Sequence, residues 1–381
     1  MIAFATTIGL FLLIIGTVIF VHELGHFVAA RLAGMVVEEF SLGMGPKIWS
    51  FTRKKTEYMV KALPIGGYVK ILGEEEEVKK KGSFSEKSVW ARMFVALAGV
   101  FMNFVFASVL FYGVLLTRDF EYEGIPYYEG FHVVCGTQEV IYAYPVTVVG
   151  IVDDTPAQEA GLEAPFEVYA VDGVSVDNYS DMHRGIESKK GGVVSLAIGY
   201  EDGSRETVSV EVGGDGIGVE VAADMKILKI SYTGWERVFG GFLHSVNMIK
   251  ANIFLFGALI GESFRERSVT PVAQSIAGPI GLVAIVDVVK QFGGLIGILD
   301  LAGLFCIALV MMNMLPFPAL DGGHAAFLAI EAVRGRPVDR KLQQWLFGIG
   351  MVVLFALMFL VSVKDVFQFG LWDWVRGPFS R

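Results

Sequence analysis

Charged residues are scarce in this 381-residue chain, because Asp, Glu, Lys and Arg make up only 19% of it while 54% is hydrophobic. A soluble globular protein has about 25% charged and about 45–50% apolar residues, so the deficit indicates a membrane protein. It also excludes a disordered chain, which needs low hydrophobicity and high net charge. Acidic residues outnumber basic ones by 40 to 31, and this balance argues against nucleic acid as a partner.

Cysteine is almost missing as well. The sequence has two, Cys135 in a polar region and Cys306 in an apolar run, so we expect no disulfide between them. A small secreted domain held together by disulfides is therefore excluded.

Long apolar runs are abundant. A spanning helix needs roughly 20 mainly apolar residues, and four runs predict transmembrane helices at residues 1–31, 90–117, 298–324 and 341–364. Lys and Arg gather in the segment 32–89 and in the link after the third span, so both are expected in the cytoplasm. The N-terminus and the acidic segment 118–290 are then outside the cytoplasm, as in a protein of the cell (inner) membrane whose partner is the lipid bilayer.

Residues 238–261 are a fifth apolar stretch, interrupted by the polar residues Ser245, Asn247, Lys250 and Asn252. The interruptions favour interfacial amphipathic helices over residues 232–290. A lone extra span would place the basic link Arg334–Lys341 outside, against the charge rule. A spanning helix stays the alternative.

Residues 145–213 have the composition of a soluble domain, with Val-rich runs separated by Gly and Asp and a short helix predicted in DNYSDMHRGIESKKGG. The order of strands and helices, with PAQEAGL followed by VDG, resembles a PDZ domain of the bacterial kind. Such α+β domains bind an extended peptide as an added strand. Pro165 and Phe166 stand where these domains usually carry a Gly-Asp turn, and a spacer without a ligand stays the alternative.

The segment 32–89 contains a second β-prone piece, LPIGGYVK. Gly66-Gly67 between short β-prone runs predicts a hairpin or a bent strand on the cytoplasmic side.

The first predicted span contains His22-Glu23-Leu24-Gly25-His26. Residues i and i+4 of a helix share a face, so both imidazoles can reach one metal ion. Glu23 is placed to hold and deprotonate a water molecule at that metal. Ionisable groups inside a membrane are costly and are functional candidates by default. A polar packing cluster, or a proton relay in a transporter, is the alternative.

A catalytic zinc site needs three protein ligands and one open position. The best candidate for the third ligand is Asp321, because the first and third spans run in the same direction and both end at the cytoplasmic side. Asp300 lies at the opposite end of the third span, and His324 is a weaker rival. Pro316 and Pro318 break the helix just before Asp321.

HELGH at 22–26 and NMLPFPALDGGH at 313–324 together resemble the two motifs of the site-2 proteases, which are intramembrane zinc metalloproteases. The chain is most similar to the regulator-of-sigma-E protease branch. LPIGGYVK at 63–70, FSEKSVWARMFVALAGVFMNFVFA at 84–107 and AGPIGLV at 277–283 extend the resemblance over nearly the whole chain, and the first of these resembles the membrane-reentrant β element of that branch. The resemblance implies Zn²⁺ held by His22, His26 and Asp321, with Glu23 as the general base. It also implies that the substrate is held as an extended strand by Asn313, Pro316, Gly66, Gly67 and Tyr68.

The expected fold class is a multi-pass α-helical membrane protein with about four transmembrane helices. An extracytoplasmic α+β PDZ-like domain is inserted in it, and a β-hairpin element lies on the cytoplasmic side. The expected partners are membrane-protein substrates with a transmembrane segment, such as anti-sigma factors or signal-peptide remnants, and a peptide or substrate tail at the PDZ-like domain.

Two departures from the branch are visible. This chain has one PDZ-like domain where some members have two, and it reads Ala98-Gly99-Val100 where members often have Gly-Pro, which we interpret as a packing difference. Asn103 is interpreted as a helix–helix hydrogen-bonding residue, with a contact to the active-site region as the alternative.

Two other classes of function compete with a protease. A membrane ion or metal transporter or sensor could use the same His/Glu/Asp cluster, and an inverted internal repeat, of which the sequence gives no sign, would favour it. A non-catalytic adaptor that presents the PDZ-like domain would be attractive only with a broken HExxH motif.

Overall fold

The computed structural model describes residues 2–74, 78, 80–142, 146–200, 204–214, 216–221 and 226–368. The chain divides into two compact units, which are described separately: unit one comprises Met1–Phe120 and Tyr232–Arg381, and unit two comprises Glu121–Ser231. Pro145, the first residue of the predicted PDZ-like domain, lies outside the described residues, as do residues 75–77 and 79 of the charged run GEEEEVKKKG.

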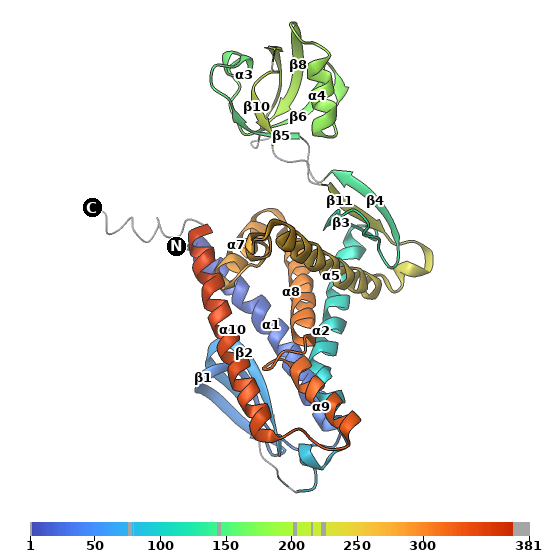
Figure 1. The fold of residues 1–381 in the computed structure, drawn as a ribbon, viewed down its shortest axis with the longest axis vertical. Coiled ribbons are helices and arrows are strands. Elements are labelled where there is room, and N and C mark those ends of the chain that lie inside the picture. The colour runs from blue at the N-terminus through green and yellow to red at the C-terminus, as the bar shows by residue number, and fades with distance from the viewer. Residues whose placement is uncertain are drawn as a thin grey trace, which may run out of the picture. The chain divides into compact units, whose positions relative to one another are not determined.

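Unit one is a set of helices with one β-hairpin against them (Figure 1). Its elements in chain order are α1 (Ile2–Leu32), β1 (Val37–Arg53), β2 (Thr56–Ile71), the 3₁₀ turn η1 (Phe84–Glu86), α2 (Val89–Thr117), the 3₁₀ turn η2 (Gly234–Arg237), α5 (Gly240–Glu266), α6 (Thr270–Ser275), α7 (Pro279–Phe292), α8 (Gly294–Met314), α9 (Asp321–Arg334) and α10 (Arg340–Gln368).

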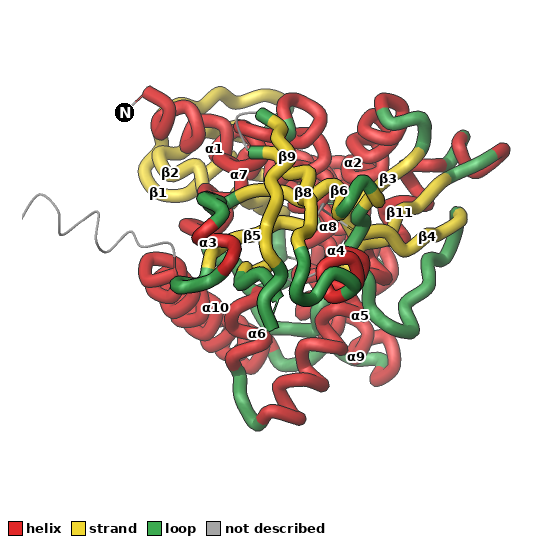
Figure 2. The backbone as a smooth tube through the Cα atoms, turned by 90° about the horizontal axis from the view of Figure 1, so that it is seen from above, coloured by secondary structure: helices red, strands yellow, loops and turns green. Residues whose placement is uncertain are grey.

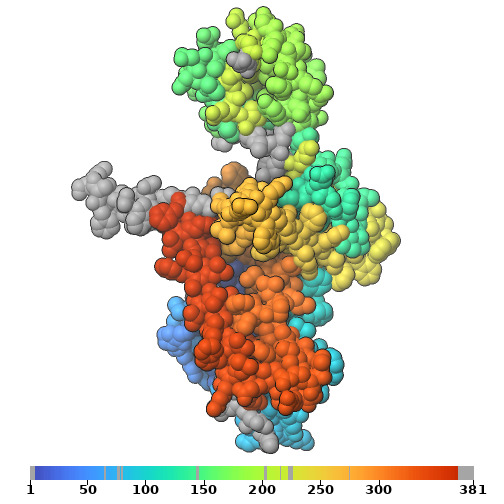
Figure 3. Space-filling view, in the orientation of Figure 1, coloured from blue at the N-terminus to red at the C-terminus, as the bar shows by residue number. Residues whose placement is uncertain are grey.

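Five helices in the described part of the chain are long and apolar enough to cross a membrane: α1, α2, α5, α8 and α10. Helix α10 shows why the unit needs an apolar solvent. It lies on the surface (Figure 3), where Trp345, Val352 and Phe359 are each about two-thirds or more exposed. Apolar patches of this extent are costly in water, so the chain is a membrane protein.

Helix α2 is the centre of unit one and packs against α1, α5, α8 and α9. Its residues Phe111, Val114 and Leu115 are fully buried. Gly303 of α8 permits close packing there, because a Cβ atom at Gly303 would lie 2.7 Å from the Phe111 ring. The Ser88 side chain caps the start of α2 by accepting the Ala91 N–H.

The polar residues of α5 that favoured an interfacial helix are partly accounted for inside the protein. Ser245 and Asn247 are fully buried. Ser108 of α2 donates a hydrogen bond to Ser245 (3.0 Å), and the Asn247 amide donates one to the Tyr232 hydroxyl (2.9 Å). The same polar positions therefore suit a helix packed against α2, and they do not by themselves require an interface.

The motif AGPIGLV has a structural role in this unit. Asp365 near the end of α10 is fully buried and accepts the N–H of Gly281 in the first turn of α7 (2.8 Å). Side chains at Gly278 or Gly281 would come within about 3 Å of the Asp365 carboxylate. The glycines thus let a carboxylate of α10 reach the positive end of α7.

The hairpin of β1 and β2 turns at Lys54-Lys55, and not at Gly66-Gly67. Residues 39–42 of β1 pair on one side with residues 57–60 and on the other with residues 67–70. This double pairing is possible because β2 bends back on itself, with Gly66 at φ +80°. Of the two local structures expected at Gly66-Gly67, the structure therefore has the bent strand.

Unit two contains two antiparallel sheets. The larger has the strand order β10-β5-β6-β8-β9 with β7 paired to β6, and its central strands lie side by side in Figure 2. Its elements are β5 (Val146–Ile151), α3 (Pro156–Glu159), β6 (Phe166–Val171), β7 (Val174–Ser175), α4 (Tyr179–Glu187), β8 (Val193–Gly199), β9 (Arg205–Glu211) and β10 (Val219–Val221). Val168, Leu196 and Val210 from three strands and Met182 and Ile186 from α4 share one buried core.

The smaller sheet has the order β3-β11-β4, from β3 (Glu121–Pro126), β4 (Thr137–Tyr142) and β11 (Lys226–Ser231). The side chain of Lys229 in β11 makes ion pairs with Glu121 (2.7 Å) and Glu123 (3.5 Å) of β3.

Candidate metal centre

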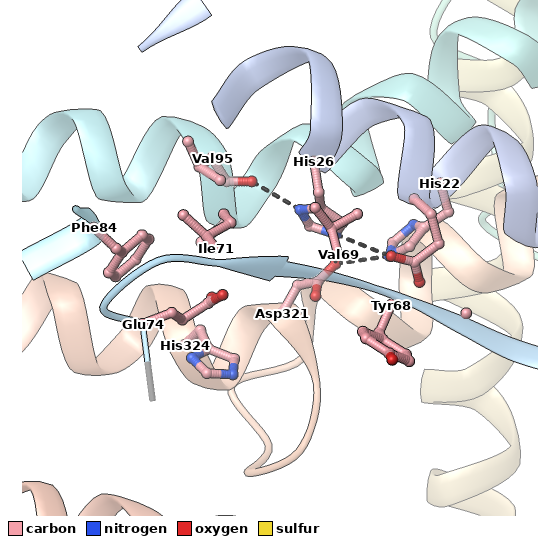
Figure 4. Close-up of a pocket in the computed structure, with 13 residues that line it drawn as sticks. His22, His26, Tyr68, Val69, Ile71, Glu74, Phe84, Val95, Asp321 and His324 are labelled. Carbon is pink, nitrogen blue, oxygen red and sulfur yellow. Dashed lines mark hydrogen bonds and ion pairs between the residues drawn. The ribbon is translucent and has the colours of Figure 1, made fainter. Parts of the chain in front are cut away.

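Helix α1 carries the HELGH motif, and His22, Glu23 and His26 of that motif line a cavity of about 240 Å³. His22 and His26 lie one helical turn apart, and their Nε2 atoms are 3.2 Å from each other. Figure 4 shows both imidazoles turned toward the Asp321 carboxylate. The spacing i and i+4 thus brings two potential ligand atoms to one point, as expected from the helical repeat.

Asp321 arrives from a distant part of the sequence. Its Oδ2 atom lies 3.0 Å from His22 Nε2 and 3.3 Å from His26 Nε2. Helix α8 ends at Met314, earlier than the predicted end of the third span at residue 324, and Asp321 is the first residue of α9. Pro316 and Pro318 in the link explain the early end, because proline cannot continue the backbone hydrogen bonding of a helix.

Two glycines after Asp321 fix the start of α9. A Cβ atom at Gly322 would lie 2.6 Å from the Met314 carbonyl oxygen, and one at Gly323 would lie 2.9 Å from the Phe317 carbonyl carbon. Only glycine permits this approach of α9 to the proline-containing link. The sequence LDGGH therefore holds the Asp321 carboxylate at the two histidines.

The three residues fit a zinc ion. Ligand atoms at about 2.0–2.1 Å from zinc in a tetrahedron are about 3.3 Å apart, and the three separations here are 3.0, 3.2 and 3.3 Å. Among the described residues, the buried Oδ2 atom of Asp321 has the two imidazole Nε2 atoms as its close polar neighbours and no other hydrogen-bond donor, as expected of an oxygen that serves a metal. Two imidazoles and one carboxylate leave a fourth position for water or substrate, as catalytic zinc sites require.

The structure orients His26 for such a role. Its Nδ1 lies 2.8 Å from the Val95 carbonyl oxygen of α2. A carbonyl oxygen can only accept, so Nδ1 carries the proton and the Nε2 lone pair faces the centre.

Glu23 lines the same cavity, next to Gly67 of β2. A Cβ atom at Gly67 would lie 2.8 Å from Glu23 Cγ and 2.9 Å from the Ser41 carbonyl oxygen. The glycine lets the strand pass directly against the carboxyl side chain.

The strand beside Glu23 presents an edge. In the described chain, residues 67–71 pair with β1 and with no other strand. Gly67, Tyr68, Val69 and Ile71 line the cavity. An edge strand has unpaired N–H and C=O groups that can bind another extended chain.

Tyr68 is held in place at this edge. Its hydroxyl donates a hydrogen bond to Glu39 (2.5 Å) and accepts one from Lys61 (3.0 Å). Gly66 lines a different groove, between α1 and the hairpin.

Asn313 and Pro316, the other two predicted substrate-binding residues, differ in position. Asn313 is buried, and its Nδ2 atom lies 3.5 Å from His22 Nε2. Pro316 is exposed in the link between α8 and α9 and is not among the described residues lining the cavity.

The rival ligands lie apart from the cluster. His324 lines the cavity but stacks on Phe347 of α10, with 4.2 Å between the ring centroids. Asp300 lies near the other end of α8, in its first two turns. Of the described acidic, His and Cys side chains, those that converge as possible ligands are His22, His26 and Asp321.

Helix α2 contributes Gly99, which the sequence indicated only as part of a packing difference, and Asn103, for which a contact to the active-site region was the alternative interpretation. A Cβ atom at Gly99 would lie 2.7 Å from His22 Cε1, and even closer to His26 Nε2, so Gly99 makes room for both rings. Asn103 is fully buried and its Nδ2 lies 3.4 Å from His22 Nδ1. The helix–helix contact of Asn103 is therefore also a contact to the site. The sequence indicated these two contacts only weakly: Gly99 is small and Asn103 is polar, and they stand four positions apart in an apolar span.

A second cavity of about 580 Å³ shares Tyr68, Val69, Glu74, Phe84 and His324 with the first. It also contains the charged side chains of Arg92, Glu331 and Arg340. These charged side chains lie among apolar ones such as Phe327, Val338 and Phe347, so the second cavity is of mixed polarity and lies at the ends of α2, α9 and α10.

Comparison with known proteins gives consistent results. Residues 10–357 match the model of peptidase family M50. A relative from Fusobacterium nucleatum, named as a candidate zinc metalloprotease, is 30% identical over 93% of this chain and 96% of its own length. One from Clostridium perfringens with the same description is 29% identical over 93% and 97%. Zinc metalloprotease RasP of Bacillus licheniformis is 26% identical over 94% and 98%.

Proposed function

This chain belongs to peptidase family M50, the site-2 protease family, and is a zinc metalloprotease; from the position of its metal centre we propose that it hydrolyses peptide bonds within or next to transmembrane segments of other membrane proteins. One observation carries the proposal: His22, Glu23 and His26 lie in α1, a helix long and apolar enough to span the bilayer. Groups that react there meet substrates that are themselves in the membrane. The alternative of an ion transporter is not favoured, because the relatives are named as metalloproteases.

His22, His26 and Asp321 would hold the zinc ion. When bound, zinc polarises the scissile carbonyl and lowers the pKa of water at its open position. The Glu23 carboxylate lines the same cavity and takes the proton from the attacking water. It then delivers that proton to the leaving amine. The Asn313 amide, at 3.5 Å from His22 Nε2, is placed to donate a hydrogen bond to the developing negative oxygen.

A helical substrate must unwind first, because its amides are hidden in its own hydrogen bonds. The edge of residues 67–71 supports binding of the unwound segment, since an extended chain can pair with it. Gly67 brings this edge into contact with Glu23. A peptide bond of a substrate paired with this edge would therefore lie next to Glu23, the general base.

The membrane topology is proposed from the site. His22 and His26 lie near the C-terminal end of α1, and Asp321 follows the C-terminal end of α8. Since these residues meet, α1 and α8 end on the same side of the bilayer. The chain between α1 and α8 must therefore cross back to the side on which α1 began, which takes an odd number of crossings. Helix α2 supplies one crossing, and a single further crossing by α5 would leave α8 starting on the wrong side. With the positive-inside rule, the N-terminus lies outside the cytoplasm, in the cell (inner) membrane.

Unit two is proposed as an extracytoplasmic PDZ-like domain that docks or filters substrates. Its larger sheet, with α4 packed on the shared core, supports this assignment. The natural substrates we propose are membrane proteins whose outer domain has been removed by another protease, such as anti-sigma factors, and remnants of signal peptides.

Glu23→Gln tests the proposal. The purified variant and wild type are reconstituted with a reporter protein that carries one transmembrane segment, and cleavage is followed by mass spectrometry. We expect no cleavage by Glu23→Gln, with zinc content unchanged, and full cleavage by Glu262→Gln, a control at an exposed glutamate of α5. Undiminished cleavage by Glu23→Gln would refute the proposed chemistry.

A further inference from the structure

Each of the two histidine ligands needs a hydrogen-bond acceptor for its Nδ1–H, on the side of the ring that faces away from the metal. An imidazole that binds metal through Nε2 carries a proton on Nδ1, and the partner of that proton sets the orientation of the ring. For His26 the partner is the Val95 carbonyl oxygen at 2.8 Å. For His22 the neighbour of Nδ1 is the side chain of Asn103.

Asn103 has the chemistry to be that partner. Its side chain is fully buried, and its Oδ1 atom has no hydrogen-bond partner within the described part of the chain. The Nδ2 atom of the Asn103 amide lies 3.4 Å from His22 Nδ1. A half-turn of the amide exchanges its oxygen and nitrogen in nearly the same space. The oxygen then lies where the His22 Nδ1–H points.

The three contacts come from one face of α2. Val95, Gly99 and Asn103 are spaced by four residues, so they lie one above the other on the helix. His26 meets Val95, both rings meet Gly99, and His22 meets Asn103. The reversed order of the pairs reflects the antiparallel course of α1 and α2. This face of α2 thus contacts both imidazoles on the side away from the metal centre.

We propose that Asn103 is a positioning residue for the metal: its Oδ1 accepts the Nδ1–H of His22 and keeps the Nε2 of that ring directed at the Asp321 carboxylate. The proposal rests on zinc binding by His22, His26 and Asp321, which is part of the proposed function. A residue that served only helix packing would be replaceable by an apolar side chain of similar size.

The test measures zinc affinity, without reference to cleavage. Asn103→Leu replaces the acceptor with an apolar side chain that is likewise branched at Cγ but larger, and Asn103→Asp keeps the acceptor. Each full-length variant is purified in detergent, stripped of metal and titrated with zinc against a chromophoric chelator. The visible spectrum of the cobalt-loaded protein reports the ligand geometry. Asn252→Leu, at an α5 asparagine that bonds the Met248 carbonyl, is the matched control.

We expect Asn103→Leu to lose roughly 10- to 100-fold in zinc affinity, the usual effect of removing a partner of a metal-binding histidine. Asn103→Asp should stay within a few-fold of wild type, and Asn252→Leu should match it. Wild-type affinity in Asn103→Leu would overturn the inference, and so would equal losses in Asn103→Leu and Asn103→Asp. Failure of the wild type to bind zinc would instead refute the metal centre itself, so the two failures are distinguishable.

Discussion

Arg92 and Glu331 form a two-pronged ion pair, with Nη1 and Nη2 of the guanidinium 3.0 and 2.5 Å from the two carboxylate oxygens. Each side chain is only 15% exposed. The pair joins the first turn of α2 to α9, the helix that begins with the metal ligand Asp321. It therefore fixes one ligand-bearing helix to the helix that backs both histidines.

Glu331→Gln should lower both stability and zinc affinity. Hydrogen bonds between charged groups contribute about 1.5–3 kcal/mol each, and loss of the carboxylate leaves the guanidinium partly buried without its counter-ion. We expect a lower temperature of unfolding in detergent and weaker zinc binding. Arg336→Met, at an exposed arginine beyond α9, is the control and should change neither. An unchanged unfolding temperature in Glu331→Gln would show that the pair does not hold α9.

Gly99→Ala should damage the metal centre while leaving the fold intact. The added methyl group would lie 2.7–2.8 Å from atoms of the His22 ring and closer still to His26, so the rings must move. We expect strongly reduced zinc content and cleavage with near-normal helicity by circular dichroism. Gly113→Ala is the matched control on the same helix, because among the described residues no atom outside its chain neighbours and the adjacent backbone of α2 lies within 4 Å of a Cβ built there. That variant should be stabilised by up to about 1 kcal/mol, the helix preference of alanine over glycine. Normal zinc content in Gly99→Ala would contradict the close packing.

The parts of the site that could be predicted from the sequence are those set by local repeats. Two histidines four residues apart on a helix must share a face, and the apolar runs on either side show that this face lies in the membrane. The parallel directions of two spans made Asp321 the best candidate for the third ligand and set Asp300 aside, with His324 left as a weaker rival. The structure brings all three together.

The contacts that α2 makes with the two histidine rings could not be predicted in the same way. The partner of His26 is the backbone carbonyl of Val95, and every residue has such a group. Gly99 acts by lacking a side chain, which has no distinctive pattern in an apolar helix. Ser245 and Asn247 show a further limit, since polar residues in a helix suit a membrane interface and a buried helix contact equally. The side chains around Ser245 and Asn247 decide between these two positions, and those side chains belong to residues far away in the sequence.

Unit two should respond to acid through Asp172. The Ser195 N–H donates to its Oδ1 (2.9 Å) and Lys189 lies 3.2 Å from its Oδ2, and these hydrogen bonds hold the pKa of Asp172 below its ordinary value of 3.8. A lowered pKa in the folded state stabilises the fold above the unfolded-state value, and the contribution is lost as the pH falls through the folded-state value.

Hydrogen exchange of β8, corrected for the intrinsic effect of pH, measures this contribution. We expect wild type to lose protection around Ser195 as the pH falls below about 4. Asp172→Asn should show weaker protection at neutral pH and little further loss in acid. Identical pH dependence in the two proteins would show that the Asp172 hydrogen bonds do not stabilise the sheet.

Removal of the metal should destabilise unit one, because a zinc ion held by His22, His26 and Asp321 would join α1 to the start of α9. A ligand that binds only the folded state stabilises it by about 2.7 kcal/mol when its free concentration is 100 times the dissociation constant. We expect a chelator to lower the unfolding temperature of wild type. Asp321→Asn, which weakens one of three ligands, should unfold at a lower temperature than zinc-loaded wild type and respond little to the chelator. Asp177→Asn, at an exposed aspartate of unit two, should respond like wild type. A full chelator response in Asp321→Asn would place the stabilising metal elsewhere than between His22, His26 and Asp321.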